Sequence, residues 1–369
     1  MNTRIEVEYW VVDSDGTLTG PGALADMSDR TKRTAVEPLL EIRTPPSETV
    51  SELRTALVTE LEAVLARAAE LDRHLVPFGT PINGDAIERR PGDRDRIWTD
   101  AIGTNADCAT YCAGTHVRVE ERDVTDQLNA LIALDPALAL VSSAPYFRGE
   151  RVANGARAYC YRKKGHEAFP NRGRPWRYVE TVDEWHRRLE HRYEEFKAAA
   201  VDAGVDGEAV EEHVSIDDVV WTPVRLRESM PTVEWRSPDA ALPSQLLRLA
   251  EDLRTVLDRL SETPVRIDAT GGHDGTGGPT ARPGHVTSDE IALPAFETVR
   301  DLAESAVRDG LESPAVAGYL ERMGFSIRDY HPITARIDGR QYVTRADACD
   351  LRLEYARRLE EDVAELARS

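Results

Sequence analysis

Carboxylates alternate with apolar residues near the start of the chain, in the segment RIEVEYWVVD (residues 4–13). Ile5 and Val7 would occupy one face of a β-strand, so Glu6 and Glu8 point to the other face. Two carboxylates side by side repel each other, and a divalent cation relieves that repulsion. A merely solvated sheet face is the alternative interpretation for a single such strand.

Three further segments show the same alternation: AVEPLLEIRTPP (residues 35–46), GTHVRVEE (114–121) and MPTVEWRSPD (230–239). If the four strands form one antiparallel sheet, one of its faces carries both acids and bases. The residues gathered on that face would be Glu6, Glu8, Glu41, Glu234, His116, Arg43, Arg118 and Arg236.

This set of side chains matches the chemistry of a metal–nucleotide site. Carboxylates and an imidazole fit hard divalent cations such as Mg²⁺ or Mn²⁺. Neighbouring arginines fit phosphate oxygens, which they bind in bidentate fashion. Together they indicate binding of a metal ion and ATP for phosphoryl transfer, in which both neutralise charge.

The overall charge excludes some classes of function. The 369 residues carry a net charge of −20, from 66 acidic and 46 basic residues, and the only lysines are Lys32, Lys163, Lys164 and Lys197. Such acidity argues against nucleic acid or anionic membranes as partners and suggests adaptation to high salt. No apolar run is long enough for a transmembrane helix, and the acidic strand begins too early for a signal peptide, so we expect a cytoplasmic protein.

The remaining segments predict a mixed α+β chain without repeats. Helices are expected from residue 47, over 182–203 and over 242–260, and the part from about 286 reads as mainly helical. The Gly-rich segment 270–285 lacks the P-loop order, which leaves a surface loop or a lid that closes on phosphate. We expect one catalytic domain over 1–369. The four cysteines form no zinc motif, and Cys108 and Cys112, which could share one helical face, are interpreted as ordinary buried thiols.

Several motifs, taken in order, resemble the carboxylate–amine ligases related to glutamate–cysteine ligase (the type 2 family of the glutamine synthetase-like superfamily). IEVEYWVVD resembles that family's GxExE…VD opening, LLEIRTPP its VEIxTP, and GTHVRVE its HVHV strand. The segment from LALVSSAPYF to FPNRGRP is similar to LxLSANSPFWxGxDTGxxSYR…FPxTGxP, and VVWTPVRLRESMPTVEWRSPD to WWDxRPSPxxxTLExRxxD. The matches run from residue 4 to about 315, where AVRDGLESP resembles a C-terminal helix motif of the family.

The resemblance implies a twisted, mainly antiparallel sheet curled into a funnel, with helices packed outside. It also implies roles for individual residues. The expected metal ligands are Glu6, Glu8, Glu41, His116 and Glu234. The expected catalytic residues are Arg236, which would contact the transferred phosphoryl group, and Arg162. The expected contacts to ATP or substrate are Arg118, Arg225, Arg43 and Lys164. Arg118 stands where the family has a second histidine, which points to a different or more acidic acceptor.

The implied reaction is the ATP-dependent formation of an amide through an acyl phosphate. The acid would be glutamate, reacting at its γ-carboxylate, and the amine would be that of cysteine. Two other interpretations remain open: a guanidine-type phosphotransferase of the same fold, and a non-catalytic metal- or metabolite-binding protein. Small amino acids and ATP are the expected partners, and a homo-oligomer is compatible with the sequence.

Overall fold

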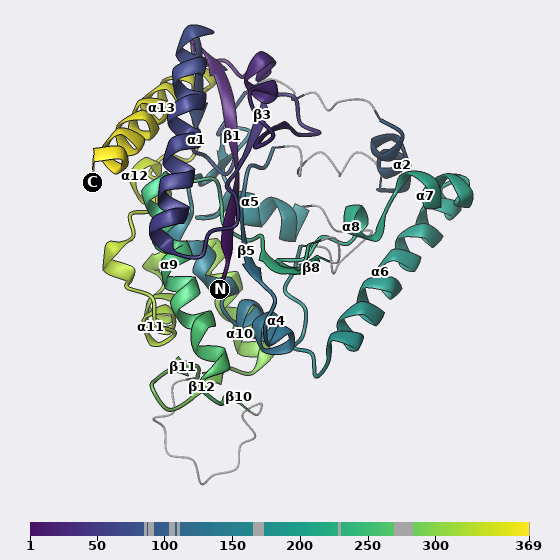
Figure 1. Ribbon diagram of the computed structural model, residues 1–369. Coiled ribbons are helices and arrows are strands. Elements are labelled where there is room, and N and C mark those ends of the chain that lie inside the picture. The colour runs from purple at the N-terminus through teal and green to yellow at the C-terminus, as the bar shows by residue number, and fades with distance from the viewer. Residues whose placement is uncertain are drawn as a thin grey trace.

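A seven-stranded antiparallel sheet forms the centre of the computed structural model (Figure 1). The structure describes residues 1–84, 87, 92–102, 108, 111–164, 173–227, 230–268 and 283–368, without the side chains of 95, 102, 163, 164 and 218. The strand order is β2-β3-β1-β5-β9-β8, and β4 pairs with the far end of β1. The strands are β1 (Thr3–Asp13), β2 (Thr31–Arg33), β3 (Leu39–Arg43), β4 (Arg73–Val76), β5 (Thr115–Glu120), β8 (Val224–Arg227) and β9 (Thr232–Trp235).

The apolar face of this sheet is covered by three long helices (Figure 1). These are α1 (Val50–Glu70), α9 (Pro243–Asp258) and α13 (Arg345–Arg368), which pack against one another. Helix α1 begins at a capping box of Thr49 and Glu52 and buries leucines such as Leu53 and Leu57. Tyr9 of β1 donates its hydroxyl hydrogen to the carbonyl of Ala241, just before α9, so this strand face points toward the helices.

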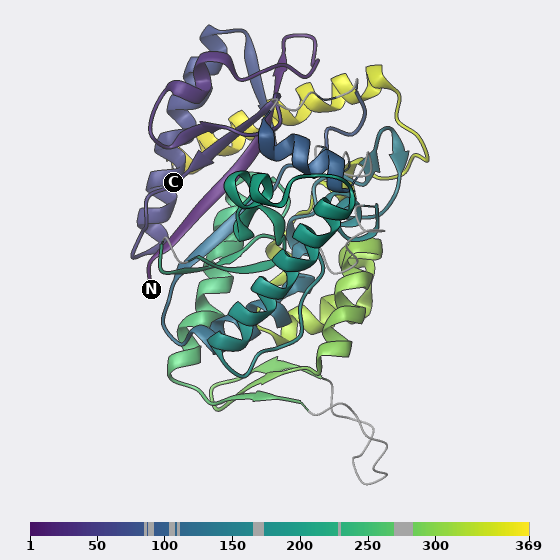
Figure 2. The ribbon, with the colours of Figure 1, turned by 90° about the vertical axis from the view of Figure 1, so that its right-hand side faces the viewer.

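The opposite, polar face looks toward a second group of helices, which stands apart from the first (Figures 1 and 2). This group consists of α2 (Asp93–Ile102), α6 (Val182–Asp202), α7 (Gly207–His213) and α8 (Ile216–Val219). Helix α6 packs against α2, α7 and α8. The polar face of the sheet therefore borders a cavity that is also lined by residues of α2 and α8.

The other elements complete the frame around the sheet. The helices are α4 (Val124–Ala133), α5 (Ala156–Tyr159), α10 (Phe296–Asp309), α11 (Pro314–Arg322) and α12 (Thr334–Ile337). Short helical turns are η1 (Gly22–Asp26), η3 (Asp135–Val141), the π-helical η4 (Cys160–Lys164), η5 (Arg259–Ser261), η6 (Gly310–Glu312) and η7 (Ile327–Asp329). The smaller sheets are β6 (Tyr146–Phe147) with β7 (Glu150–Arg151), and β10 (Val265–Ile267), β12 (Ile291–Leu293) and β11 (His285–Val286).

Most elements expected from the sequence are present. The mixed α+β class is confirmed, as are the helices over 182–203 and 242–260 and the helical part after 286. Two strands are shorter than expected: β3 begins at Leu39, so Glu37 lies outside it, and β9 ends at Trp235. Strands β2 and β8 were not expected. The Gly-rich segment falls largely on residues outside the described part, and the single catalytic domain stays a prediction.

Among the described residues, no single helix combines the length and apolarity needed to cross a membrane. Two consecutive helices, α4 and η3, pass that test only when taken together, and they are bent by 56° relative to each other. Most of their side chains are buried inside the protein.

Candidate active site

The strand pairing brings the charged residues of the polar face side by side. Glu6 lies opposite Arg43 on one neighbouring strand and opposite His116 on the other. Glu8 lies opposite Glu41 in the β1–β3 pair. A cavity of about 850 Å³ covers this face and also reaches residues of α2, η4 and α8. The convergence expected from strand alternation is therefore present.

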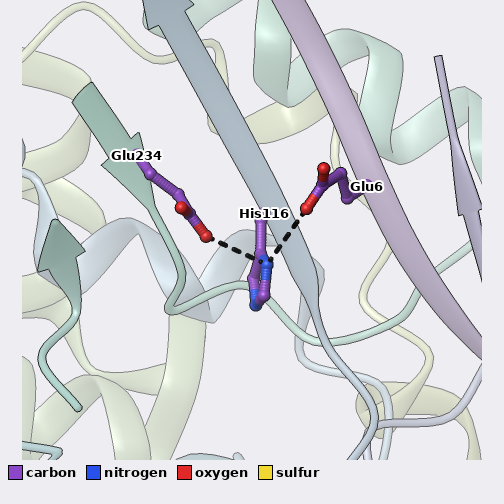
Figure 3. A group of neighbouring side chains, drawn as sticks. All are labelled: Glu6, His116 and Glu234. Atoms are coloured by element: carbon purple, nitrogen blue, oxygen red, sulfur yellow. Dashed lines mark ion pairs between the residues drawn. The ribbon is translucent and has the colours of Figure 1, made fainter. Parts of the chain in front are cut away.

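At the centre of the face, His116 lies between two carboxylates, Glu6 from β1 and Glu234 from β9 (Figure 3). Its Nδ1 atom is 3.1 Å from Glu234 Oε1 and 3.7 Å from Glu6 Oε2. One ligand atom of each residue lies within 4.8 Å of the other two, close enough for one metal ion. Burial lowers the pKa of His116, but the Glu234 carboxylate outweighs this effect and raises it above its ordinary value.

Glu234 is fully buried and is surrounded by guanidinium groups. Arg227 Nε lies 3.0 Å from Glu234 Oε2, and Arg236 Nε lies 3.4 Å from Oε1. Arg118 approaches both acids, with Nε 3.5 Å from Glu234 and Nη2 2.6 Å from Glu6. Burial would raise the pKa of Glu234, yet His116 and the surrounding arginines hold it well below the usual range. With three arginines around one carboxylate, this end of the cavity favours an anion.

Arg236 has hydrogen-bonding capacity that the protein does not use. Its Nη1 atom is buried and has no hydrogen-bond partner among the described residues, although its side chain lines the cavity. Burial lowers the pKa of Arg236 to about 10, even though Glu234 acts in the opposite direction. A buried guanidinium N–H without a partner is costly, and an oxygen of an anionic ligand in the cavity would satisfy it.

Two aromatic rings position Arg236 from the side. The rings of Tyr161 and Trp221 are stacked in parallel, with centroids 4.2 Å apart and an interplanar angle of 2°. The Cζ atom of Arg236 lies 5.2 Å from the Trp221 centroid, and that of Arg157 lies 5.3 Å from Tyr161. A cation–π contact of this kind holds the guanidinium over the face of the ring. The contacts thus form a column in the order Arg157, Tyr161, Trp221 and Arg236, and the last three of these residues line the cavity.

The other end of the cavity wall carries the acids Glu8 and Glu41, with Lys32 of β2 opposite Glu41. Burial, followed by the charges of Glu6 and Glu8, raises the pKa of Glu41. Glu8 Oε2 accepts a hydrogen bond of 2.9 Å from the Gly114 amide, and Glu41 Oε1 is 3.5 Å from Arg43 Nε. Burial is the larger cause of this shift, and repulsion from the neighbouring carboxylates adds to it. Carboxylate oxygens are the ligands that Mg²⁺ and Mn²⁺ prefer, and a divalent cation would relieve the repulsion between them.

Other residues expected at the site lie at its edge or away from it. Arg43 and Arg225 line the cavity, but Arg225 is already paired with Asp217. Arg162 lies elsewhere: its Nη1 and Nη2 atoms are 2.9 and 3.0 Å from the two carboxylate oxygens of the buried Asp135. The side chain of Lys164 lies outside the described part of the chain. The substrate roles of these residues stay predictions.

The structure also brings in residues that the sequence did not single out. Arg227 lies on β8, and Trp221 and Tyr161 come from segments more than fifty residues apart in the chain. Asp217 of α8 pairs with Arg225 and lies 3.9 Å from Arg227 Nη1. In the sequence only the alternation of Arg225 and Arg227 within VRLR signals a role, since they would share one strand face.

The arrangement of sheet and helices is similar to that of ligases of the glutamate–cysteine ligase fold, as the sequence motifs suggested. The chain superposes on a bifunctional glutathione synthetase from Pasteurella multocida with a TM-score of 0.58 and 15% identity, covering 98% of this chain. It superposes on glutamate–cysteine ligase from Francisella tularensis, solved in complex with AMP, with a TM-score of 0.56 and 12% identity.

The extent of these matches differs. This chain spans 53% of the length of the bifunctional enzyme and 91% of the length of the glutamate–cysteine ligase. No protein-family model matches the sequence, and no curated protein matches it. At such low identity the likeness concerns the fold.

Proposed function

We propose that this protein is an ATP-dependent carboxylate–amine ligase, which forms an amide through an acyl phosphate. The observation that carries the proposal is the division of one cavity wall into an acidic and a basic end. Glu8 and Glu41 lie at the acidic end, Arg118 and Arg236 lie at the basic end, and Glu6, which pairs with Arg118, lies between the two. The likeness of fold to glutamate–cysteine ligase supports the same class of reaction.

In this proposal the metal ion, Mg²⁺ or Mn²⁺, is held at the acidic end. Glu8 and Glu41 would hold it together with Glu6, whose carboxylate also pairs with Arg118, and Glu6, His116 and Glu234 are close enough together to form a second position. A divalent cation supplies charge neutralisation for the phosphates of ATP. The guanidinium groups around Glu234 weaken the second position, because they already neutralise its carboxylate.

The basic end would bind the phosphoryl group that is transferred. Arg236 lines the cavity and has a buried N–H group without a partner among the described residues, and Glu234 and Trp221 hold its guanidinium in place. A donor fixed in this way needs no reorganisation when negative charge develops on the transferred group. Phosphoryl transfer requires positioning and charge neutralisation rather than covalent help from the protein, and this wall offers both.

The substrate acid would be glutamate, activated at its γ-carboxylate, and the amine would be that of cysteine or a related compound. Arg118 is the residue of the cavity wall that we expect to affect substrate specificity most. Its guanidinium contacts Glu6 and Glu234 and is almost fully buried. An additional cation beside the metal ligands favours a substrate with more negative charge.

The test is a screen for ADP release with MgATP over pairs of acids and amines. We expect release above background only when an acid and an amine are both present, together with an amide of their combined mass. Release with a single guanidino compound, with the phosphorylated product accumulating, would instead indicate the phosphotransferase. Binding of ATP without any release over the whole screen would indicate the non-catalytic binding protein.

A further inference from the structure

Three of the four cysteines come together next to the candidate active site. Cys160, the first residue of the π-helical turn η4, lies against the thiols of Cys108 and Cys112. Tyr111 and Phe147 pack around this group and make it mainly apolar. The sequence places Cys160 about fifty residues after the other two, so the group exists only in the folded protein.

The three thiols differ in their access to solvent. Cys160 is fully buried, and Cys112, which is 4% exposed, lines the cavity over the polar sheet face. The thiol of Cys112 points toward the Cys108 carbonyl, at 3.3 Å. Cys108 is partly exposed but is not among the residues that line the cavity. A small molecule inside the cavity therefore meets Cys112 first and has Cys160 directly behind it.

We propose that Cys112 and Cys160 form a thiol–disulfide exchange pair, which reacts with low-molecular-weight disulfides that enter the cavity. Cys112 reacts first and Cys160 resolves the mixed disulfide. Cys160 is unsuited to the first attack, because hydrogen bonds with the neighbouring thiols and burial raise its pKa well above that of a free thiol. As the second thiol it needs only to be adjacent, and exchange through a mixed disulfide is the ordinary route.

The exchange balances in two steps. The Cys112 sulfur attacks one sulfur of R–S–S–R, that bond breaks, and R–SH leaves with the Cys112 proton. The Cys160 sulfur then attacks the Cys112 sulfur of the mixed disulfide, and a second R–SH leaves with the Cys160 proton. In total, the small disulfide is reduced to two thiols and the two cysteines are oxidised to one internal disulfide.

An internal disulfide would connect two segments of the cavity wall. Cys112 precedes β5, which carries His116 and Arg118, and Cys160 precedes Tyr161 of the aromatic column. A bond between them fixes the distance from β5 to η4 within the narrow limits of disulfide geometry. The exchange therefore links the oxidation of the thiols to the shape of the cavity.

The experiment treats the purified, reduced protein with bis(2-hydroxyethyl) disulfide and maps the products by mass spectrometry without reduction. Cleavage after arginine and after Tyr111 separates Cys108 from Cys112, so the partners are identified without ambiguity. We expect a Cys112–Cys160 disulfide in the wild type, formed with loss of two hydrogens. In Cys160→Ser the hydroxyethyl group should remain attached to Cys112. Cys349→Ser, which changes the thiol outside the cluster, should behave as the wild type.

Other outcomes would overturn the proposal. These are a wild type in which Cys112 stays reduced, a wild type in which the mixed disulfide persists, and a link from Cys160 to Cys108. Circular dichroism checks the fold of Cys160→Ser, and Cys160→Ala replaces it if the serine is not tolerated. The measurement needs no ATP, so its result is independent of the proposed ligase activity.

Discussion

The guanidinium of Arg236 lies over the indole of Trp221, with its Cζ atom 5.2 Å from the ring centroid. On its other side, Arg236 Nε lies 3.4 Å from the buried carboxylate of Glu234. These two contacts fix the group at the edge of the cavity while Nη1 keeps no partner among the described residues. Arg236 thus keeps hydrogen-bonding capacity that the described residues do not use, and its orientation depends on a ring that lies outside the sheet.

Arg236→Lys should lower kcat by about 10²-fold or more, with a smaller effect on the KM for ATP. Lysine keeps the charge but loses the planar fork, and the contact strengthens only as charge builds on the transferred group. Steady-state kinetics measure the effect, with Arg122→Lys as a control on the surface. Full activity of a folded Arg236→Lys protein would exclude this residue from the reaction.

Trp221→Leu should lower kcat/KM roughly tenfold, as expected from the loss of one buried cation–π contact. Trp221→Phe should restore most of the loss, because it keeps an aromatic face. If Trp221 acts through Arg236, the leucine variant should have little further effect in an Arg236→Lys background, which a double-mutant cycle measures. Additive effects in that cycle would mean that Trp221 serves only the packing.

Glu8→Gln should abolish turnover and leave the fold intact, because it removes one negative charge from the acidic end. The amide keeps an oxygen that can accept the Gly114 hydrogen bond, so the change isolates the charge. Calorimetric titration with Mg²⁺ in the presence of a non-hydrolysable ATP analogue should show weaker metal binding. Glu150→Gln, an exposed carboxylate on β7, is the matched control. Near-normal activity of Glu8→Gln at limiting Mg²⁺ would contradict a metal site at this end.

Arg162→Ala should reduce stability, by about 3–5 kcal/mol, because it leaves Asp135 buried without its partner. This ion pair gives Arg162 a structural contact that differs from the substrate contact expected from the sequence. Denaturant unfolding of Arg162→Ala and of the double variant Arg162→Met/Asp135→Asn measures the effect, and the double variant should lose less. Unchanged stability together with a tenfold higher KM would return Arg162 to substrate binding.

The composition of the polar face was predictable because strand alternation is a local property. Glu6 and Glu8 share a face with His116 and Glu234 as soon as four strands form one antiparallel sheet. Residue spacing is enough to predict this shared face once the four strands are assumed to form one antiparallel sheet. The family resemblance added the expected metal and phosphate roles, and the fold comparison confirms the resemblance at the level of architecture.

The partition of that face into two ends was not predictable. It depends on strand order, which puts β8 and Arg227 beside Glu234 and leaves Glu41 on the far side of β1. Strand β8 has only four residues, too few for a clear period. The stack of Tyr161 and Trp221 has no sequence signal, because it joins the π-helical turn η4 to an irregular segment through tertiary contact.

In the proposed reaction, ATP cleavage produces an acyl phosphate, and this intermediate then reacts with the amine to form the amide. This intermediate is tested most directly by labelling the carboxylate of the substrate acid with ¹⁸O. The acid is the one that the ADP-release screen identifies. If the acid attacks the γ-phosphorus, one labelled oxygen must leave with the phosphate when the amine displaces it. Mass spectrometry of the released phosphate should therefore show one ¹⁸O atom for each amide formed. Amide formation with unlabelled phosphate would contradict the acyl-phosphate mechanism.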